Sequence, residues 1–167
     1  YGISVVNSHF FSGGKILVSN RNILDPLFWK NLDKYKITNI SFVPFQYELL
    51  EKIGLDRIKI KSLRFLTQAG GKLDTILANK VVKYVLKLKK FFYIMYGQTE
   101  AAPRISYIKN EQIIKNIGSV GKTIPGGNIS IVNKNQEGVG EIVYSGPNVF
   151  CGYFKNKDDY KSCRSIK

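Results

Sequence analysis

The sequence has few of the side chains that bind transition metals, with one histidine and two cysteines among 167 residues. Zinc sites in proteins use four ligands, mostly thiolate sulfur and imidazole nitrogen. Cys151 and Cys163 form no C-x-x-C pair, and neither lies near His9 in the chain. This scarcity argues against a zinc site, and two thiols in a chain of this size favour a reducing, cytoplasmic setting. Because His9 stands beside two phenylalanines, we expect a structural histidine rather than a catalytic base.

Long apolar runs are also missing from the sequence. No stretch approaches the roughly 20 apolar residues that a transmembrane helix needs, so we expect no membrane span. The chain begins at Tyr1, without a methionine or a basic signal-like segment, and we therefore expect either a removed start or a piece of a longer protein. A hydrophobic content of 44% is enough for one globular core.

Acidic residues are scarce as well. The chain has 12 of them against 26 basic residues, which gives a net charge of +14. Such a charge raises the hypothesis of a nucleic-acid or membrane-surface protein. However, most of the excess is lysine dispersed along the chain, and the densest cluster, residues 83–90, has the apolar spacing of an amphipathic helix. Arginine is rare, so we favour solvated lysine faces and expect no nucleic-acid partner.

Apolar and β-branched runs alternate with helical patterns through the first two thirds of the chain. The predicted strands are residues 15–18, 39–43, 63–67 and 92–95, and the predicted helices begin at Asp25-Pro26, Phe45 and Asp74. Asp25 and Asp74 are suited to cap their helices. This alternation predicts an α/β fold, with a parallel sheet flanked by helices.

Glycine punctuates the chain after Arg104, where short β-type runs replace the helical patterns. Residues 128–132 and 141–144 flank a turn and form a plausible hairpin. We therefore divide the chain into an α/β part, residues 1–116, and a small glycine-rich β subdomain that begins at residue 117 and is incomplete at residue 167.

A cluster of polar side chains follows the most aromatic of the predicted strands. Gln98, Thr99 and Glu100 come directly after that strand and Gly97, while Gly70-Gly71 follows the strand before it. Ligands of open α/β sheets bind beyond the carboxyl ends of the strands, so we expect both loops to border one crevice. Carboxylate oxygen together with phosphate is what Mg²⁺ prefers. Taken singly, Glu100 could be a solvated carboxylate and Gly70-Gly71 an ordinary turn.

Several blocks of the sequence match one known family in order. They are Tyr1-Gly2-Ile3-Ser4, Ser62-Leu63-Arg64 with Ala69-Gly70-Gly71-Lys72-Leu73, Tyr96-Gly97-Gln98-Thr99-Glu100, Gly118-Ser119-Val120-Gly121-Lys122, and Gly140-Glu141-Ile142-Val143 with the glycines and aromatic residues up to Tyr153. These blocks resemble those of the adenylate-forming, AMP-binding enzymes, which include the acyl-CoA synthetases. The resemblance implies part of the large N-terminal domain of an enzyme that joins a carboxylic acid to ATP and then passes the acyl group to a thiol such as coenzyme A.

The resemblance also implies roles for individual residues. The residues implied in nucleotide binding are Gly70, Gly71, Lys72, Tyr96, Gly97, Gln98 and Thr99. Tyr96 would lie against the adenine, Thr99 would hydrogen-bond the α-phosphate, and Glu100 would bind Mg²⁺, which makes Thr99 and Glu100 the catalytic candidates. The implied cofactors are ATP or AMP and Mg²⁺, with coenzyme A as co-substrate and a small carboxylic acid as partner.

Three parts of the family pattern have no match here. These are the phosphate loop that would precede Tyr1, the T-G-D block expected soon after Tyr153, and the C-terminal lid domain with its lysine. We therefore expect no adenylation by these 167 residues alone. Two alternatives stay open, namely a nucleotide-binding remnant without chemistry and a basic nucleic-acid or membrane-surface protein. The acidic pair Asp158-Asp159 is interpreted as solvated, and the sequence specifies neither the acid nor the oligomeric state.

Overall fold

The computed structural model describes residues 1–156 and residue 158. The helices are α1 (Gly2–Phe11), α2 (Pro26–Lys34), α3 (Pro44–Ile53), α4 (Thr75–Lys87) and α5 (Glu111–Lys115), with short 3₁₀ helices η1 (Leu55–Lys59) and η2 (Thr99–Ala101). The strands are β1 (Asn39–Phe42), β2 (Phe65–Gln68), β3 (Phe91–Tyr96), β4 (Ser106–Lys109), β5 (Lys122–Thr123), β6 (Asn128–Val132) and β7 (Glu141–Ser145). The predictions that concern Asp159 and Cys163 lie outside the described residues.

The main sheet has five strands in the order β1-β2-β3-β4-β5. Its first three strands pair in parallel, as the alternation of strands and helices predicts. Strands β4 and β5 were not predicted; they extend the sheet in the antiparallel direction, so the sheet is mixed. The return is direct because β3 is followed by η2 and a short turn, with no long crossover helix before β4.

The predicted strand at residues 15–18 is wrong. These residues have no regular structure, and the side chain of Val18 is 88% exposed. An apolar run becomes a strand only where another strand accepts its backbone hydrogen bonds. Here the segment runs as a linker between α1 and α2, and β1 is left as the edge of the sheet.

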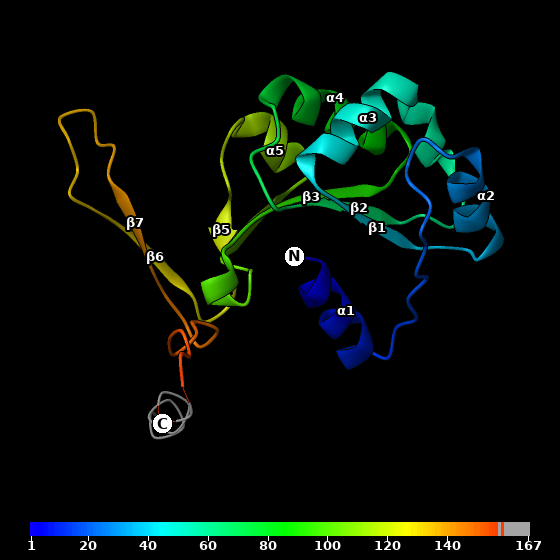
Figure 1. The fold of residues 1–167 in the computed structure, drawn as a ribbon. Helices are drawn as coiled ribbons and strands as arrows, with labels where there is room; N and C mark the ends of the chain where they lie inside the picture. The colour runs from blue at the N-terminus through cyan, green and yellow to red at the C-terminus, as the bar shows by residue number, and fades with distance from the viewer. Residues whose placement is uncertain (157, 159–167) are drawn as a thin grey trace.

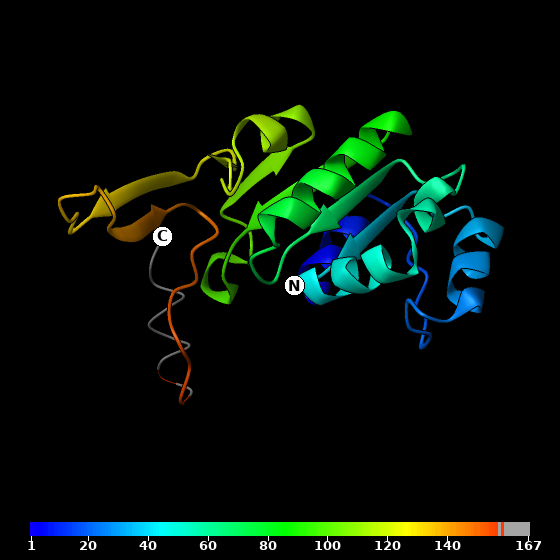
Figure 2. The same ribbon diagram turned by 90° about the horizontal axis from the view of Figure 1, so that it is seen from above.

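Helices cover the two faces of the sheet unequally. Helices α3 and α4 lie together over one face, while α1 lies beneath the other (Figure 1). The view from above shows α3 and α4 side by side over the parallel strands (Figure 2). The hydrophobic core lies on the α3–α4 side, where the side chains of Tyr47, Leu66, Val81, Val85 and Phe92 are fully buried.

Tyr47 is the central aromatic side chain of this core. Its ring meets those of Phe42 and Phe92, with centroid distances of 5.6 and 5.4 Å. Its hydroxyl donates a hydrogen bond of 3.0 Å to the backbone carbonyl of Thr67 on β2. Tyr47 therefore fixes α3 against the strand that leads to the glycine loop.

The predicted caps of α2 and α4 are confirmed. The carboxylate of Asp25 accepts a hydrogen bond of 2.8 Å from the backbone N–H of Leu27, and that of Asp74 accepts one of 2.9 Å from Leu77. Each bond satisfies an N–H group that the first helical turn leaves without an intrahelical partner. The cap at Asp74 sets where α4 begins, only a few residues after Gly71.

The predicted hairpin is confirmed as a two-stranded antiparallel sheet of β6 and β7, separate from the main sheet. Most of its side chains are exposed on both faces, and it extends away from the helices as an arm (Figures 1 and 2). Within the described residues, no helix is both long and apolar enough to cross a membrane.

Candidate functional site

A cavity of about 520 Å³ lies where β2 and β3 end. The parallel register pairs Gln68 with Ile94, so the loops that follow the two strands leave the sheet at neighbouring points. The cavity is lined by five of the residues predicted for nucleotide binding, Gly70, Gly71, Lys72, Tyr96 and Gly97. The two strand-end loops therefore converge as expected, on the face of the sheet that α4 covers.

Bare glycine backbone forms part of the cavity wall. Gly70 has a φ of +81°, which L side chains rarely adopt, and a Cβ atom there would lie 3.3 Å from a methyl group of Val43. At Gly97 a Cβ atom would lie 2.2 Å from the backbone carbonyl oxygen of Pro103, a distance that real contacts do not reach. Only glycine at position 97 lets the chain fold back so closely after β3.

Apolar side chains supply most of the remaining lining. They come from the loop before α4, from α4, β3 and α5, and from the loop before β5, namely Leu73, Ala78, Ile94, Met95, Ile113, Ile117 and Val120. Gly118 and Ser119 also line the cavity, so three residues of the G-S-V-G block border it. None of these residues was predicted as a site residue from the sequence. The match of the block to the family, in order with the other blocks, is the feature that could have indicated them.

Two polar side chains of the lining bear on the shape of the cavity. Gln68 is fully buried, and its amide nitrogen donates a hydrogen bond of 2.8 Å to the carbonyl of Gly71, which holds the glycine loop against the end of β2. Among the described residues, the side-chain oxygens of Gln68 and Asn79 are buried without a hydrogen-bond partner. Neither residue was predicted from the sequence.

Gln98, Thr99 and Glu100 do not line the cavity, although they follow Gly97 directly. They enter the single 3₁₀ turn η2, in which Ala101 N–H donates to the carbonyl of Gln98 at 3.0 Å. The side chains of Gln98 and Thr99 are exposed. The structure thus divides the predicted set into a group that lines the cavity and a group on the adjoining turn.

Glu100 is held by the segment that follows the hairpin. The hydroxyl of Tyr153 donates a hydrogen bond to a carboxylate oxygen of Glu100, and the backbone N–H of Phe150 donates to the carbonyl of Glu100 at 2.7 Å. The bond from Tyr153 lowers the pKa of the Glu100 carboxyl below its ordinary value, and the same bond raises the pKa of Tyr153. Glu100 is therefore an anion at neutral pH.

The chemistry of this turn fits a magnesium ion. A carboxylate has two oxygens, so Glu100 retains one that Tyr153 does not use. Within the described residues there is no group of three histidine, cysteine, aspartate or glutamate side chains that could enclose a metal ion. Mg²⁺ is commonly held by one or two carboxylates, with phosphate and water completing its shell.

His9 has the structural role that was expected of it. Its Nδ1 atom lies 2.7 Å from the carbonyl of Val5, and the amide nitrogen of Asn39 lies 2.8 Å from its Nε2 atom. The first contact lies within α1, and the second joins α1 to the edge strand β1. A second cavity of about 540 Å³ borders this edge, and the lining described for it includes His9 but none of the predicted nucleotide-binding residues.

Comparison with known proteins supports the resemblance. The family model described as "AMP-binding enzyme" matches residues 1–154. An uncharacterized acyl-CoA ligase, YtcI, of Bacillus subtilis is 31% identical over 140 residues, which cover 78% of this chain and 25% of the relative. A 2-succinylbenzoate–CoA ligase of Bacillus cereus is 29% identical over 165 residues, covering 94% of this chain and 32% of the relative. The chain thus spans about a third or less of the length of these relatives.

Solved structures have the same fold. The o-succinylbenzoate CoA synthetase MenE of Bacillus subtilis, in complex with its acyl-adenylate intermediate, superposes with a TM-score of 0.74 at 23% identity, covering 93% of this chain and 32% of that one. The same enzyme in complex with ATP and a magnesium ion gives a TM-score of 0.73 at 22% identity, over 96% and 33% of the two chains. At these identities the likeness concerns the fold.

Proposed function

This chain belongs to the AMP-binding enzyme family, and on that premise we propose that it binds an adenine nucleotide as part of an ATP-dependent ligase that joins a carboxylic acid to coenzyme A. The observation that carries the proposal is the cavity at the ends of β2 and β3, because five residues chosen from the sequence alone line it. A cytoplasmic location, where ATP and coenzyme A are available, goes with this proposal.

The adenine ring would occupy the cavity. Its volume of about 520 Å³ lies within the roughly 300–1,000 Å³ typical of small-molecule sites. Its apolar lining suits a flat aromatic base, and Tyr96 offers an aromatic ring that could lie against it. The bare backbone at Gly70 and Gly71 lets the base approach closely from the other side.

The phosphate end of the nucleotide would lie over η2. Thr99 would donate its hydroxyl to the α-phosphate, Glu100 would bind Mg²⁺ through the carboxylate oxygen that Tyr153 does not use, and Lys72 in the cavity lining would add positive charge. A magnesium ion in this position supplies charge neutralisation as the acid attacks the α-phosphate and pyrophosphate leaves. The exposure of Thr99 leaves its hydroxyl open to a phosphate.

Binding and turnover are separate parts of the proposal. The acid substrate and the acceptor thiol are contacted by a complete ligase, whereas the 167 residues contain no match to the phosphate loop, the T-G-D block or the lid lysine. We therefore expect these residues alone to bind nucleotide without forming acyl adenylate. Acid-dependent exchange of pyrophosphate into ATP by the purified chain would contradict this expectation.

Calorimetry with AMP and Mg²⁺ tests the binding step. We expect AMP to bind, and we expect Ser119→Phe, which places a ring at the cavity border, to weaken that binding by about tenfold or more, equivalent to about 1.4 kcal/mol. Ser130→Phe is the matched control because Ser130 lies on β6, away from the cavity. Absence of AMP binding to the folded chain, or equal loss in both variants, would refute the proposed site.

A further inference from the structure

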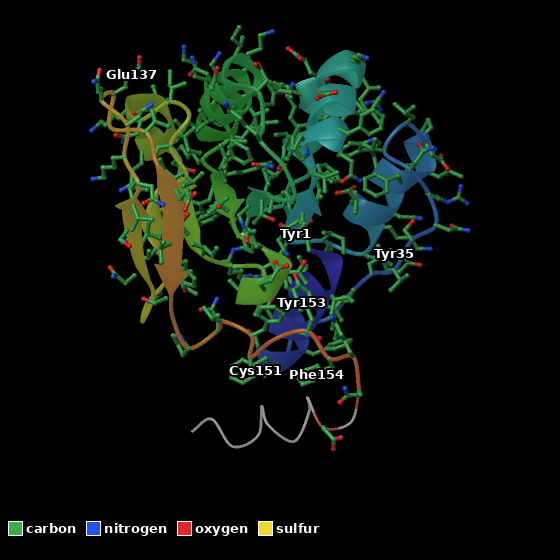
Figure 3. The ribbon with its side chains drawn as sticks, turned by 60° about the vertical axis from the view of Figure 1, so that its left-hand side comes forward. Tyr1, Tyr35, Glu137, Cys151, Tyr153 and Phe154 are labelled. Carbon is green, nitrogen blue, oxygen red and sulfur yellow. The ribbon has the colours of Figure 1, made fainter. Side chains whose placement is uncertain are left out.

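The segment that follows the hairpin contains the contacts that hold the Glu100 turn. We call residues 146–153 the return segment, because they lead the chain from β7 back to η2. Figure 3 shows Tyr153 on this part of the chain, beyond the end of the arm rather than out along it. The return segment lies outside the cavity lining, so its part in the site has to come from its contacts with η2.

Asn148 joins the return segment to the backbone of the turn. Its side-chain nitrogen donates to the carbonyl of Ala101 at 2.5 Å and to that of Arg104 at 2.8 Å. Its side-chain oxygen accepts a hydrogen bond of 2.7 Å from the hydroxyl of Tyr144 on β7, which fixes the orientation of the amide. One side chain therefore ties both ends of the turn from Ala101 to Arg104 to the hairpin.

The turn itself has only a few backbone hydrogen bonds, although Ala101 is buried and the N–H of Ile105 closes the loop onto the carbonyl of Tyr96 at 2.9 Å. Its own backbone bonds are local, from Ala101 to Gln98, from Ala102 to Thr99 and from Arg104 to Ala101, and no side chain caps η2. A 3₁₀ turn has poorer hydrogen-bond geometry than an α-helix and is used in short pieces. The contacts from the return segment add to these bonds, and they are the ones that reach the backbone and the carboxylate of Glu100 from outside the turn.

We propose that Asn148 and Tyr153 are positioning residues for Glu100, so that Asn148 holds the backbone of the turn and Tyr153 fixes the orientation of the carboxylate that would bind Mg²⁺. The inference rests on the proposed function, because it takes Glu100 as the metal ligand. Groups that hydrogen-bond a metal ligand fix its orientation, and their loss typically weakens metal binding about 10–100-fold. The hairpin would thus place the return segment, with these two side chains, beside η2.

The test measures Mn²⁺ affinity by electron paramagnetic resonance, with the whole 167-residue chain saturated with AMP and with Mn²⁺ standing in for Mg²⁺. Tyr153→Phe removes only the hydroxyl, and we expect it to weaken Mn²⁺ binding about tenfold. Metal-free AMP affinity should stay within a factor of about two, since Tyr153 does not line the cavity. Tyr35→Phe is the matched control, because this exposed tyrosine stands at the C-terminal end of α2, outside both η2 and the return segment.

Asn148→Asp tests the backbone contact. The substitution keeps the size of the side chain and its acceptor for Tyr144, but removes the donor to Ala101 and Arg104. We expect weaker Mn²⁺ binding and faster hydrogen exchange at the N–H groups of Ala101 and Ala102. Unchanged exchange together with unchanged metal affinity would overturn the role of Asn148.

Glu100→Gln separates failure of the inference from failure of the proposed function. If this variant binds Mn²⁺ as well as the original chain, Glu100 is not the ligand and both proposals fall. If it loses the metal while Tyr153→Phe keeps full affinity, only the positioning role falls. Tighter Mn²⁺ binding by Tyr153→Phe would also overturn the inference, because Tyr153 would then compete with the metal for the carboxylate.

Discussion

The main sheet and the hairpin arm stabilise the two halves of the candidate site by different means. The parallel strands β1 to β3 pack against α3 and α4, and their inward side chains are buried. Strands β6 and β7 have the same number of residues as each other, full pairing and almost no buried side chain. The main sheet therefore has a hydrophobic core of its own, whereas the hairpin arm is held by backbone pairing between its strands and by hydrogen bonds to the main body.

This difference matches the division of the site. The cavity is a product of the core, since its walls are the ends of buried strands and the first turns of α4. The Glu100 turn lies outside the cavity and is held by polar contacts from the return segment. Substitutions in the core should therefore lower both stability and AMP affinity. Substitutions in the return segment should affect the proposed metal binding at Glu100, with little loss of stability.

Removing Tyr47 should have the largest effect. Tyr47→Ala leaves a cavity in the core and removes the hydrogen bond to Thr67, so we expect a loss of about 3–5 kcal/mol in the free energy of unfolding, measured by urea denaturation. Val143→Ala on the half-exposed face of β7 is the comparison, with an expected loss below about 1 kcal/mol. Equal losses would contradict the contrast between core and arm.

Gly97→Ala should distort the junction between the cavity and the turn. The added methyl group would lie 2.2 Å from the carbonyl oxygen of Pro103, and relieving that overlap should cost about 3 kcal/mol in unfolding free energy. AMP affinity should fall with it. Gly2→Ala is the control, because nothing lies within 4 Å of the added carbon in α1. An alanine at position 97 that left both stability and AMP binding unchanged would disprove the close approach.

Lys90 is a buried charged residue at the edge of the core, directly before β3. Its side chain is 9% exposed, and its ammonium donates to the carbonyls of Ile60 and Leu63 at 2.7 and 2.5 Å. Lys90→Met should cost about 2 kcal/mol, because both carbonyls lose their charged donor. Urea denaturation at neutral pH gives this loss.

The pH dependence of the same variant has a definite sign. Burial lowers the pKa of Lys90, so between that lowered pKa and the ordinary lysine value the folded chain binds fewer protons than the unfolded chain. The Lys90 contribution to stability therefore rises with pH in that window. The Met variant should lack this rise, and parallel stability curves for the two proteins would refute it.

Asp74→Ala should have the smallest effect of the series. The substitution removes the cap at Leu77 and should cost about 1 kcal/mol, again by urea denaturation. Asp74→Asn keeps a capping oxygen and should restore most of that loss. If both variants were equally destabilised, the cap would not be the cause.

Much of the core region could be predicted because each of its elements has a local signal. Asp25 and Asp74 stand where the first turn of a helix needs a hydrogen-bond acceptor. The strand before Gly97 consists of aromatic and other apolar residues, a composition typical of a buried strand. The strand at residues 15–18 failed because an apolar run does not reveal whether a partner strand is present. β4 was missed because Ser106–Lys109 is short and mixed in polarity, and only its pairing with β3 makes it a strand.

The arrangement of the Glu100 turn could be predicted only in part. The blocks brought Thr99 and Glu100 to attention, but the contact between Asn148 and Ala101 joins residues 47 positions apart, and that between Tyr153 and Glu100 joins residues 53 positions apart. No periodicity or propensity encodes a side-chain hydrogen bond over such a separation. The lining residues Gln68 on β2 and Asn79 on α4 were missed for a different reason, since their place in the cavity follows from how α4 packs on the sheet.

Chemical-shift mapping of the isotope-labelled chain with AMP tests the central claim most directly. The account predicts that the largest changes occur at the backbone amides of Gly70, Gly71, Tyr96 and Gly97 and at Ser119, with little change along β6. Changes centred on the cavity beside β1 and His9, or no changes at saturating AMP, would contradict the assignment of the nucleotide site to the ends of β2 and β3.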